Sequence, residues 1–279
     1  MFTTLIDVSG LEALLRDGRV TLFDCRFDLA DSTAGCALYA AGHIADAHYL
    51  NLDDDLSARP TGSNGRHPLP DRDALARTLR ACGLNKGQQV VAYDASGGIY
   101  AARLWWLLRW LGHDAVAVLD GGLQAWEAAG LPLASLCPDP THGDFQASQA
   151  AAMPTATAAD ILREGERLSV VDARAPHRFR GEPDPLDPVA GHIPGARNRF
   201  FRDNLREDGH FKAASTLASE WRALAGSDEP HTIVHQCGSG VTAAHNLLAM
   251  ELAGLRGARL YPGSWSEWIS DPSRPVERG

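Results

Sequence analysis

The segment HTIVHQCGSGVTAAHNLLAMEL, residues 231–252, decides the fold of this 279-residue chain. Its start, Thr232-Ile233-Val234, is apolar and β-branched and predicts a short buried strand of the kind found in parallel sheets. Its end, residues 243–250, has apolar residues at helical spacing. Between these two parts lies a glycine-containing loop that begins at Cys237. The segment therefore predicts one strand, loop and helix of an α/β fold.

The loop is suited to carry a reactive cysteine. Gly238 and Gly240 allow it to curl so that successive backbone N–H groups point inward and form an anion site. The N-terminus of the following helix adds partial positive charge, which favours the thiolate, the form that attacks. Cys237 is therefore the candidate nucleophile, and a buried, inert cysteine is the alternative reading.

Length and composition limit the possible classes of protein. A chain of this length suits two domains, and a net charge of −9 argues against nucleic acid as the main partner. An anionic substrate then needs a local positive site. The five cysteines are widely spaced and odd in number, which suits a reducing compartment and gives neither a disulfide framework nor a zinc pattern. We see no signal peptide and no membrane span, so we expect a soluble cytoplasmic protein.

An internal repeat predicts the architecture. Each half contains an Asp-x-Arg strand end, an Ala-Gly-His-Ile motif, a strand ahead of a helix, and a closing Gly and Trp segment. These features lie at residues 20–26, 41–44, 89–93 and 119–126 in the first half, and at 168–174, 190–193, 232–236 and 260–268 in the second. Alternating strands and helices predict two α/β domains, each with a mostly parallel sheet covered by helices on both faces. We expect domains at 1–134 and 153–279, joined by a linker at 135–152.

The two copies differ where chemistry is expected. Asp94 takes the place in the first copy that Cys237 holds in the second, so we expect the first domain to be catalytically silent. Residues that recur in both copies are expected to be structural. We expect Asp24 to form an ion pair with Arg26, and Asp172 with Arg174. We expect His43 and His192 to support the scaffold.

The loop CGSGVTA, residues 237–243, resembles the active-site loop of the rhodanese superfamily, in particular of the sulfurtransferases that use 3-mercaptopyruvate. The resemblance extends over nearly the whole chain and implies two tandem rhodanese-like domains. Thiosulfate-preferring members more often carry a basic residue where this chain has Gly238. Cysteine-dependent phosphatases have a similar loop that ends in an arginine, and Ala243 at that place disfavours a phosphatase.

The resemblance implies further catalytic residues. In such sulfurtransferases a histidine and an upstream aspartate reach across the domain interface toward the catalytic serine and cysteine. The matching positions here are His67, in the long polar loop Gly65–Pro70, and Asp53, with Ser239 as the serine. Ser239 is either a turn former or a hydroxyl relay that moves a proton at the sulfur centre together with His67. His67 could otherwise be an ordinary surface residue.

The resemblance also implies an anion site. The arginine of the family's Arg-Phe pair binds the donor's carboxylate or oxyanion, and it corresponds to Arg178. The loop residues Gly238, Gly240, Val241 and Thr242 complete the expected substrate-binding set. Mercaptopyruvate-type members often have a second arginine further along, where this chain has Leu186. We therefore expect no fixed cation beside the sulfur.

The predicted reaction moves a sulfur atom from 3-mercaptopyruvate, through a persulfide on Cys237, to a thiol, a protein thiol or cyanide. We expect no metal and no organic cofactor, because the thiol itself carries the group. Thiosulfate as the donor is the alternative, and a non-enzymatic persulfide carrier or interaction module is a more distant one.

Overall fold

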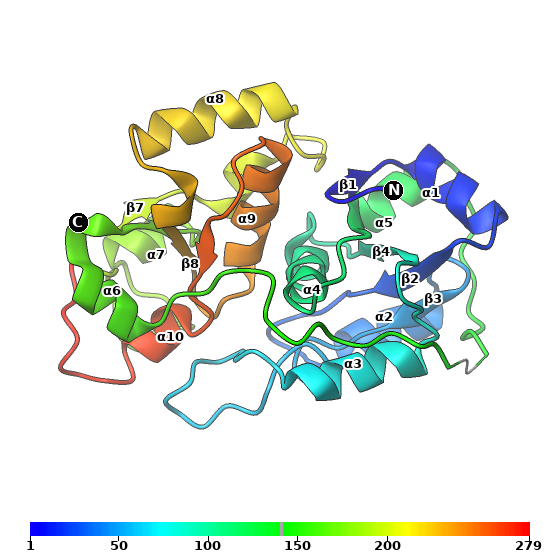
Figure 1. Cartoon of the computed structure of the whole chain (residues 1–279), viewed down its shortest axis with the longest axis horizontal. Coiled ribbons are helices and arrows are strands. Elements are labelled where there is room, and N and C mark those ends of the chain that lie inside the picture. The colour runs from blue at the N-terminus through cyan, green and yellow to red at the C-terminus, as the bar shows by residue number, and fades with distance from the viewer. Residues whose placement is uncertain (140–141) are drawn as a thin grey trace. The chain divides into compact units, whose positions relative to one another are not determined.

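The computed structural model describes residues 1–139 and 142–279, which divide into two compact units (Figure 1). Unit 1 contains Met1–Ala58, Leu69–Ala152 and Glu207–His210, and unit 2 contains Arg59–Pro68, Met153–Arg206 and Phe211–Gly279. The segment Arg59–Pro68, which includes His67, therefore belongs to the unit of Cys237 although it lies in the first half of the sequence.

Unit 1 is built on a five-stranded sheet whose strands run in the order β1-β5-β4-β2-β3, with every neighbouring pair parallel. Helix α4 packs against β4 and β5, and α5 packs against β5. In chain order the elements are β1 (Leu5–Ile6), α1 (Val8–Arg16), β2 (Val20–Asp24), α2 (Ala34–Ala41), β3 (Ala47–Tyr49), α3 (Arg72–Ala81), β4 (Gln89–Tyr93), α4 (Ile99–Trp110), β5 (Val116–Leu119) and α5 (Gly122–Ala128).

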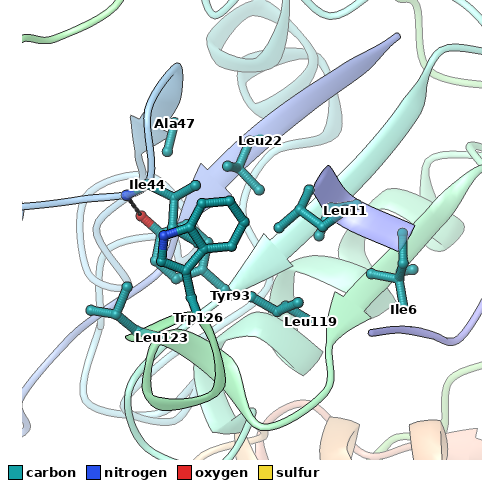
Figure 2. Close-up of a cluster of buried hydrophobic side chains, with 11 residues drawn as sticks. Ile6, Leu11, Leu22, Ile44, Ala47, Tyr93, Leu119, Leu123 and Trp126 are labelled. Atoms are coloured by element: carbon teal, nitrogen blue, oxygen red, sulfur yellow. Dashed lines mark hydrogen bonds between the residues drawn. The ribbon is translucent and has the colours of Figure 1, made fainter. Parts of the chain in front are cut away.

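The core of unit 1 forms because its central strands are apolar on both faces, as parallel strands covered by helices must be. Leu22 on β2 lies opposite Val91 on β4, and both are buried. Figure 2 shows Tyr93 and Trp126 within this cluster, where the Tyr93 hydroxyl accepts a hydrogen bond from the backbone N–H of Ile44 (3.1 Å). The polar end of the tyrosine is thus satisfied inside an apolar core.

Unit 2 has a shorter version of the same arrangement, a parallel sheet in the order β7-β6-β8-β9. Helix α9 packs against β8, β9 and α8 (Figure 1). In chain order the elements are α6 (Ala158–Glu164), η1 (Gly165–Arg167), β6 (Ser169–Asp172), α7 (Pro176–Arg180), β7 (Arg197–Asn198), η2 (Phe201–Asn204), α8 (Ala214–Ala225), η3 (Pro230–Thr232), β8 (Ile233–Gln236), α9 (Thr242–Leu252), β9 (Arg259–Leu260) and α10 (Ser264–Trp268).

The residues that recur in both copies are structural, as predicted. Asp24 and Arg26 pair at 2.6 Å, and Asp172 and Arg174 pair at 2.7 Å, with all four side chains buried. The histidines make matching contacts as well. His43 Nδ1 lies 2.7 Å from the Tyr39 carbonyl and His192 Nδ1 lies 2.7 Å from the Phe179 carbonyl, each ring stacked on that aromatic side chain.

The expected linker contains neither helix nor strand at residues 135–139 and 142–152. Its described part nevertheless hydrogen-bonds into unit 1. Backbone N–H groups of Phe145, Ser148 and Ala152 donate to carbonyls of Leu84, Leu111 and Trp110, respectively. None of the helices in the described part of the chain has the length and hydropathy of a membrane span.

Candidate active site

The loop of Cys237 lies at the carboxyl end of β8 and connects this strand to α9. Its backbone is fixed by the segment that begins α10. Trp265 N–H donates to the Cys237 carbonyl (2.9 Å), and the Cys237 N–H donates to Ser264 Oγ (3.1 Å). Ser264 is fully buried and has a φ of +51°, a left-handed conformation that is costly for a residue other than glycine. The loop is therefore held against a second, strained turn.

Gly240 supplies the contact to the sulfur. Its backbone N–H donates to Cys237 Sγ at 3.2 Å, which favours negative charge on that atom. The residue has a φ of +80°, and a Cβ at this position would lie 2.3 Å from the Pro262 carbonyl oxygen. Only glycine fits both demands. Cys237 itself is 2% exposed.

The other expected loop residues surround the cysteine along the chain. Gly238 and Ser239 follow it directly, Val241 is the N-cap of α9, and Thr242 is the first residue of that helix. Their backbone groups thus lie at a helix N-terminus, where anions are favoured. That these residues bind substrate stays a prediction.

His67 and Ser239 come together within unit 2. His67 Nδ1 lies 2.7 Å from Ser239 Oγ, although 172 positions separate the residues in sequence. Both side chains are buried. The segment Arg59–Pro68, which carries His67, is grouped with unit 2 although it lies in the first half of the sequence. The catalytic roles of His67 and Ser239 stay predictions. The pair can pass a proton between a ring nitrogen and a hydroxyl two residues from the cysteine.

Asp53 belongs to unit 1, in the loop after β3, and is exposed. Its backbone N–H donates to Asn51 Oδ1 (2.8 Å). Partial loss of solvation, together with the charge of Asp54, raises the pKa of the Asp53 carboxyl. Its role in catalysis stays a prediction.

Arg178 is partly buried and lies in an ion cluster centred on the buried Asp187. Its Nε donates to Asp187 Oδ2 at 2.8 Å, and its Nη2 lies 2.7 Å from the same oxygen. Arg174, fully buried, also donates to Asp187 Oδ2 (3.1 Å). Burial lowers the pKa of Arg174, but the charges of Asp172 and Asp187 outweigh this and raise it. These contacts orient Arg178 beside the cysteine loop, since a Cβ on Gly238 would lie 3.1 Å from its Nη2.

Arg66 is a residue of this site that the sequence analysis did not single out. A Cβ on Gly238 would lie 2.8 Å from Arg66 Nη2, so a guanidinium approaches the residue next to the cysteine. The expectation that no fixed cation lies beside the sulfur is therefore wrong. The sequence signal that could have identified Arg66 is that it directly precedes His67, because a loop that brings His67 to Ser239 also brings its neighbour close to the site.

Unit 1 has the equivalent loop, with a carboxylate in place of the thiol. Asp94 follows β4 directly and is fully buried. Its two oxygens accept four backbone hydrogen bonds of 2.8 to 3.0 Å, from the N–H groups of Ser96, Gly98, Tyr100 and Ala101. Burial raises the pKa of this carboxyl, and the four donors oppose the rise. The anion site of unit 1 is thus occupied by its own side chain.

Among residues 1–139 and 142–279, no group of three or more His, Cys, Asp and Glu side chains is arranged to hold a metal ion.

Comparison with known proteins identifies the class. The model of the rhodanese-like domain matches the chain twice, over residues 7–129 and 155–271. The chain therefore belongs to the rhodanese family, with two domains in tandem, and the predicted fold class is confirmed.

The relatives of the chain are named as sulfurtransferases. A Pseudomonas aeruginosa protein named "Probable 3-mercaptopyruvate sulfurtransferase" is 48% identical over 99% of this chain and 98% of its own length. The thiosulfate sulfurtransferase of Bos taurus is 30% identical over 100% of this chain and 97% of its own. The structure of 3-mercaptopyruvate sulfurtransferase from Leishmania major superimposes with a TM-score of 0.84 at 31% identity, covering 95% of this chain and 74% of that one. The prediction of a sulfurtransferase enzyme is confirmed.

Proposed function

We propose that unit 2 transfers a sulfur atom from 3-mercaptopyruvate, through a persulfide on Cys237, to a thiol, a protein thiol or cyanide. The observation that carries this choice of donor is the 2.7 Å contact between His67 Nδ1 and Ser239 Oγ beside the cysteine loop. Departure of pyruvate requires a proton at carbon, whereas sulfite departs from thiosulfate as a stable anion. A proton relay beside the cysteine loop therefore assists the reaction of 3-mercaptopyruvate, whereas the reaction of thiosulfate does not need one.

The reaction balances with the groups present. The Cys237 thiolate attacks the mercapto sulfur, a sulfur–sulfur bond forms, and the carbon–sulfur bond of the donor breaks. The electron pair of that bond stays on carbon as the enolate of pyruvate. The Ser239 and His67 pair delivers the proton that completes pyruvate. An acceptor nucleophile then attacks the outer sulfur and restores the Cys237 thiolate, helped by the N–H of Gly240.

The charge of the anion site also favours a monoanionic donor. Three guanidinium groups and three carboxylates make up the cluster, so its side chains carry no net formal charge. The members are Arg66, Arg174, Arg178, Asp172, Asp184 and Asp187. A thiosulfate dianion brings a second negative charge to this neutral set and to a thiolate nearby. Mercaptopyruvate brings a single carboxylate.

The loop of Asp94 in unit 1 supplies no nucleophile to the proposed chemistry, because Asp94 occupies the place of the cysteine and fills its own anion site. Asp53 is the residue of unit 1 that we keep as a candidate for catalysis. We place the reaction in the cytoplasm, which the absence of paired cysteines supports: all five thiols are free. No residue of the proposed mechanism calls for an organic cofactor.

Two measurements test the proposal. Steady-state kinetics with 3-mercaptopyruvate and with thiosulfate should give a higher kcat/KM for the former. Mass spectrometry of the intact protein after donor treatment should show one added sulfur, absent from Cys237→Ser and present in the control Cys36→Ser, which alters an exposed cysteine of unit 1. A higher kcat/KM for thiosulfate contradicts the donor, and a persulfide that survives in Cys237→Ser contradicts the nucleophile.

A further inference from the structure

The segment Arg59–Pro68 brings a second guanidinium to the cysteine loop. The backbone N–H of Arg66 donates to Ser266 Oγ at 3.0 Å, which anchors this segment to the start of α10. Ser266 N–H in turn donates to the Gly238 carbonyl at 3.0 Å. The backbone of Arg66 is therefore tied, through one residue, to the backbone of the loop that holds Cys237.

The Arg66 side chain is oriented by its Nη1 group. Nη1 donates to the Leu186 carbonyl at 2.6 Å and lies 3.7 Å from Asp187 Oδ1. The Nη2 group of the same guanidinium is the atom that lies nearest to the side-chain position of Gly238. One end of the planar fork is thus fixed by protein oxygens, while the other end is presented beside the cysteine.

Arg178 presents a similar group and contacts the other oxygen of Asp187, Oδ2. A Cβ on Gly238 would lie 2.8 Å from Arg66 Nη2 and 3.1 Å from Arg178 Nη2. Within the described residues Arg178 Nη2 has no acceptor with hydrogen-bond geometry, although it lies close to Asp187 Oδ2. Both Nη2 groups therefore approach the side-chain position of Gly238, the residue that follows Cys237.

The electrostatics of Arg66 agree with this position. Burial and the nearby charge of Arg178 lower the pKa of the Arg66 guanidinium, and they outweigh the opposite effects of Asp187 and Cys237. The guanidinium is thus influenced by both the other arginine and the nucleophile. Asp187 contacts both guanidinium groups and offsets part of their repulsion, and a donor carboxylate beside the two Nη2 groups would offset more of it.

We propose that Arg66 binds the carboxylate of the sulfur donor together with Arg178, and so takes the place of the arginine that is missing at Leu186. This inference rests on the proposed function and names a residue that it did not require. The Leu186 backbone carbonyl, rather than a side chain at that position, contributes by orienting the replacement. Two planar guanidinium groups that bind one carboxylate select the ligand both by its charge and by its planar geometry.

Arg66→Ala tests the proposal, and Arg59→Ala is the matched control, because Arg59 is an exposed arginine of the same segment. Two constants are measured: KM for 3-mercaptopyruvate, and the inhibition constant of pyruvate, which keeps the carboxylate but lacks the sulfur. Loss of one charge-assisted contact should raise both constants together by roughly tenfold or more, with a smaller change in kcat. Arg59→Ala should leave both unchanged.

The proposal is overturned if Arg66→Ala and Arg59→Ala behave alike, or if KM rises while the inhibition constant of pyruvate stays constant. Thermal unfolding checks that Arg66→Ala is folded, and if it is not, Arg66→Lys gives the same comparison with the charge kept and the fork lost. A wild-type enzyme that prefers thiosulfate refutes the proposed donor instead, so the two failures can be told apart.

Discussion

Replacing His67 by asparagine tests whether this residue moves a proton or only holds the loop. An asparagine amide can occupy the region of Nδ1, 2.7 Å from Ser239 Oγ, and keep a hydrogen bond there, but it cannot carry a proton near neutral pH. General acid–base catalysis contributes roughly 10²- to 10⁴-fold. We therefore expect kcat/KM for 3-mercaptopyruvate to fall by about 100-fold in His67→Asn, equivalent to about 2.7 kcal/mol of transition-state stabilisation. The thiosulfate reaction should fall much less, because sulfite needs no proton to leave.

The assay compares pyruvate and sulfite release for wild type, His67→Asn, Ser239→Ala and the double variant. His231→Asn is the control, because His231 is an exposed histidine in η3, the short 3-10 helix before β8. Groups that act as one relay give non-additive losses, so the double variant should be no worse than the poorer single one. Equal losses with both donors, or losses that add in the double variant, would refute the relay and leave His67 as a structural contact.

Two further predictions concern the turns that frame the anion sites. Asp94→Asn places an amide group against backbone N–H donors, so it should lower the free energy of unfolding by about 2 kcal/mol. The sulfur transfer at Cys237 should remain. A variant that loses this activity while its stability is unchanged contradicts the prediction. Ser264→Ala loses the hydrogen bond from the Cys237 N–H but keeps the strained backbone, whereas Ser264→Gly also relieves about 1 kcal/mol of strain. Urea unfolding should thus find the glycine variant the more stable of the two, and the reverse order would show that the strain is absent.

Much of the fold could be predicted because the determining signals are local. The strand, loop and helix around Cys237 follow from a short apolar run, two glycines and a helical spacing that all lie within one stretch. The repeat then transfers that assignment to the first half, where Asp94 stands directly after β4 as Cys237 stands after β8. Local patterns that occur twice constrain each other, which a single copy does not allow.

The position of Arg66 could not be predicted in this way, because it depends on contacts that are distant in sequence. The hydrogen bond from Arg66 N–H to Ser266 spans 200 positions, and no spacing rule connects them. Ser264 was missed for a different reason. Its counterpart in the first copy is Gly122, with a φ of +60°, and the change from glycine to serine at such a position marks strain only once the backbone is known.

The loops that follow β4 in unit 1 and β8 in unit 2 differ in the group that their backbone N–H donors stabilise. In unit 1 the Asp94 carboxylate satisfies four backbone donors, so the loop is saturated and has no capacity for an external anion. In unit 2 a single sulfur replaces two oxygens, and among the described residues the Gly240 N–H is the donor found on it. We expect other backbone N–H groups at the start of α9 to stabilise the negative charge that develops during transfer. An aspartate in this loop thus supplies a stabilising internal anion, whereas a cysteine leaves a site that can stabilise a transient one. The proposed donor-binding arginines, Arg66 and Arg178, both belong to unit 2, where the cysteine is.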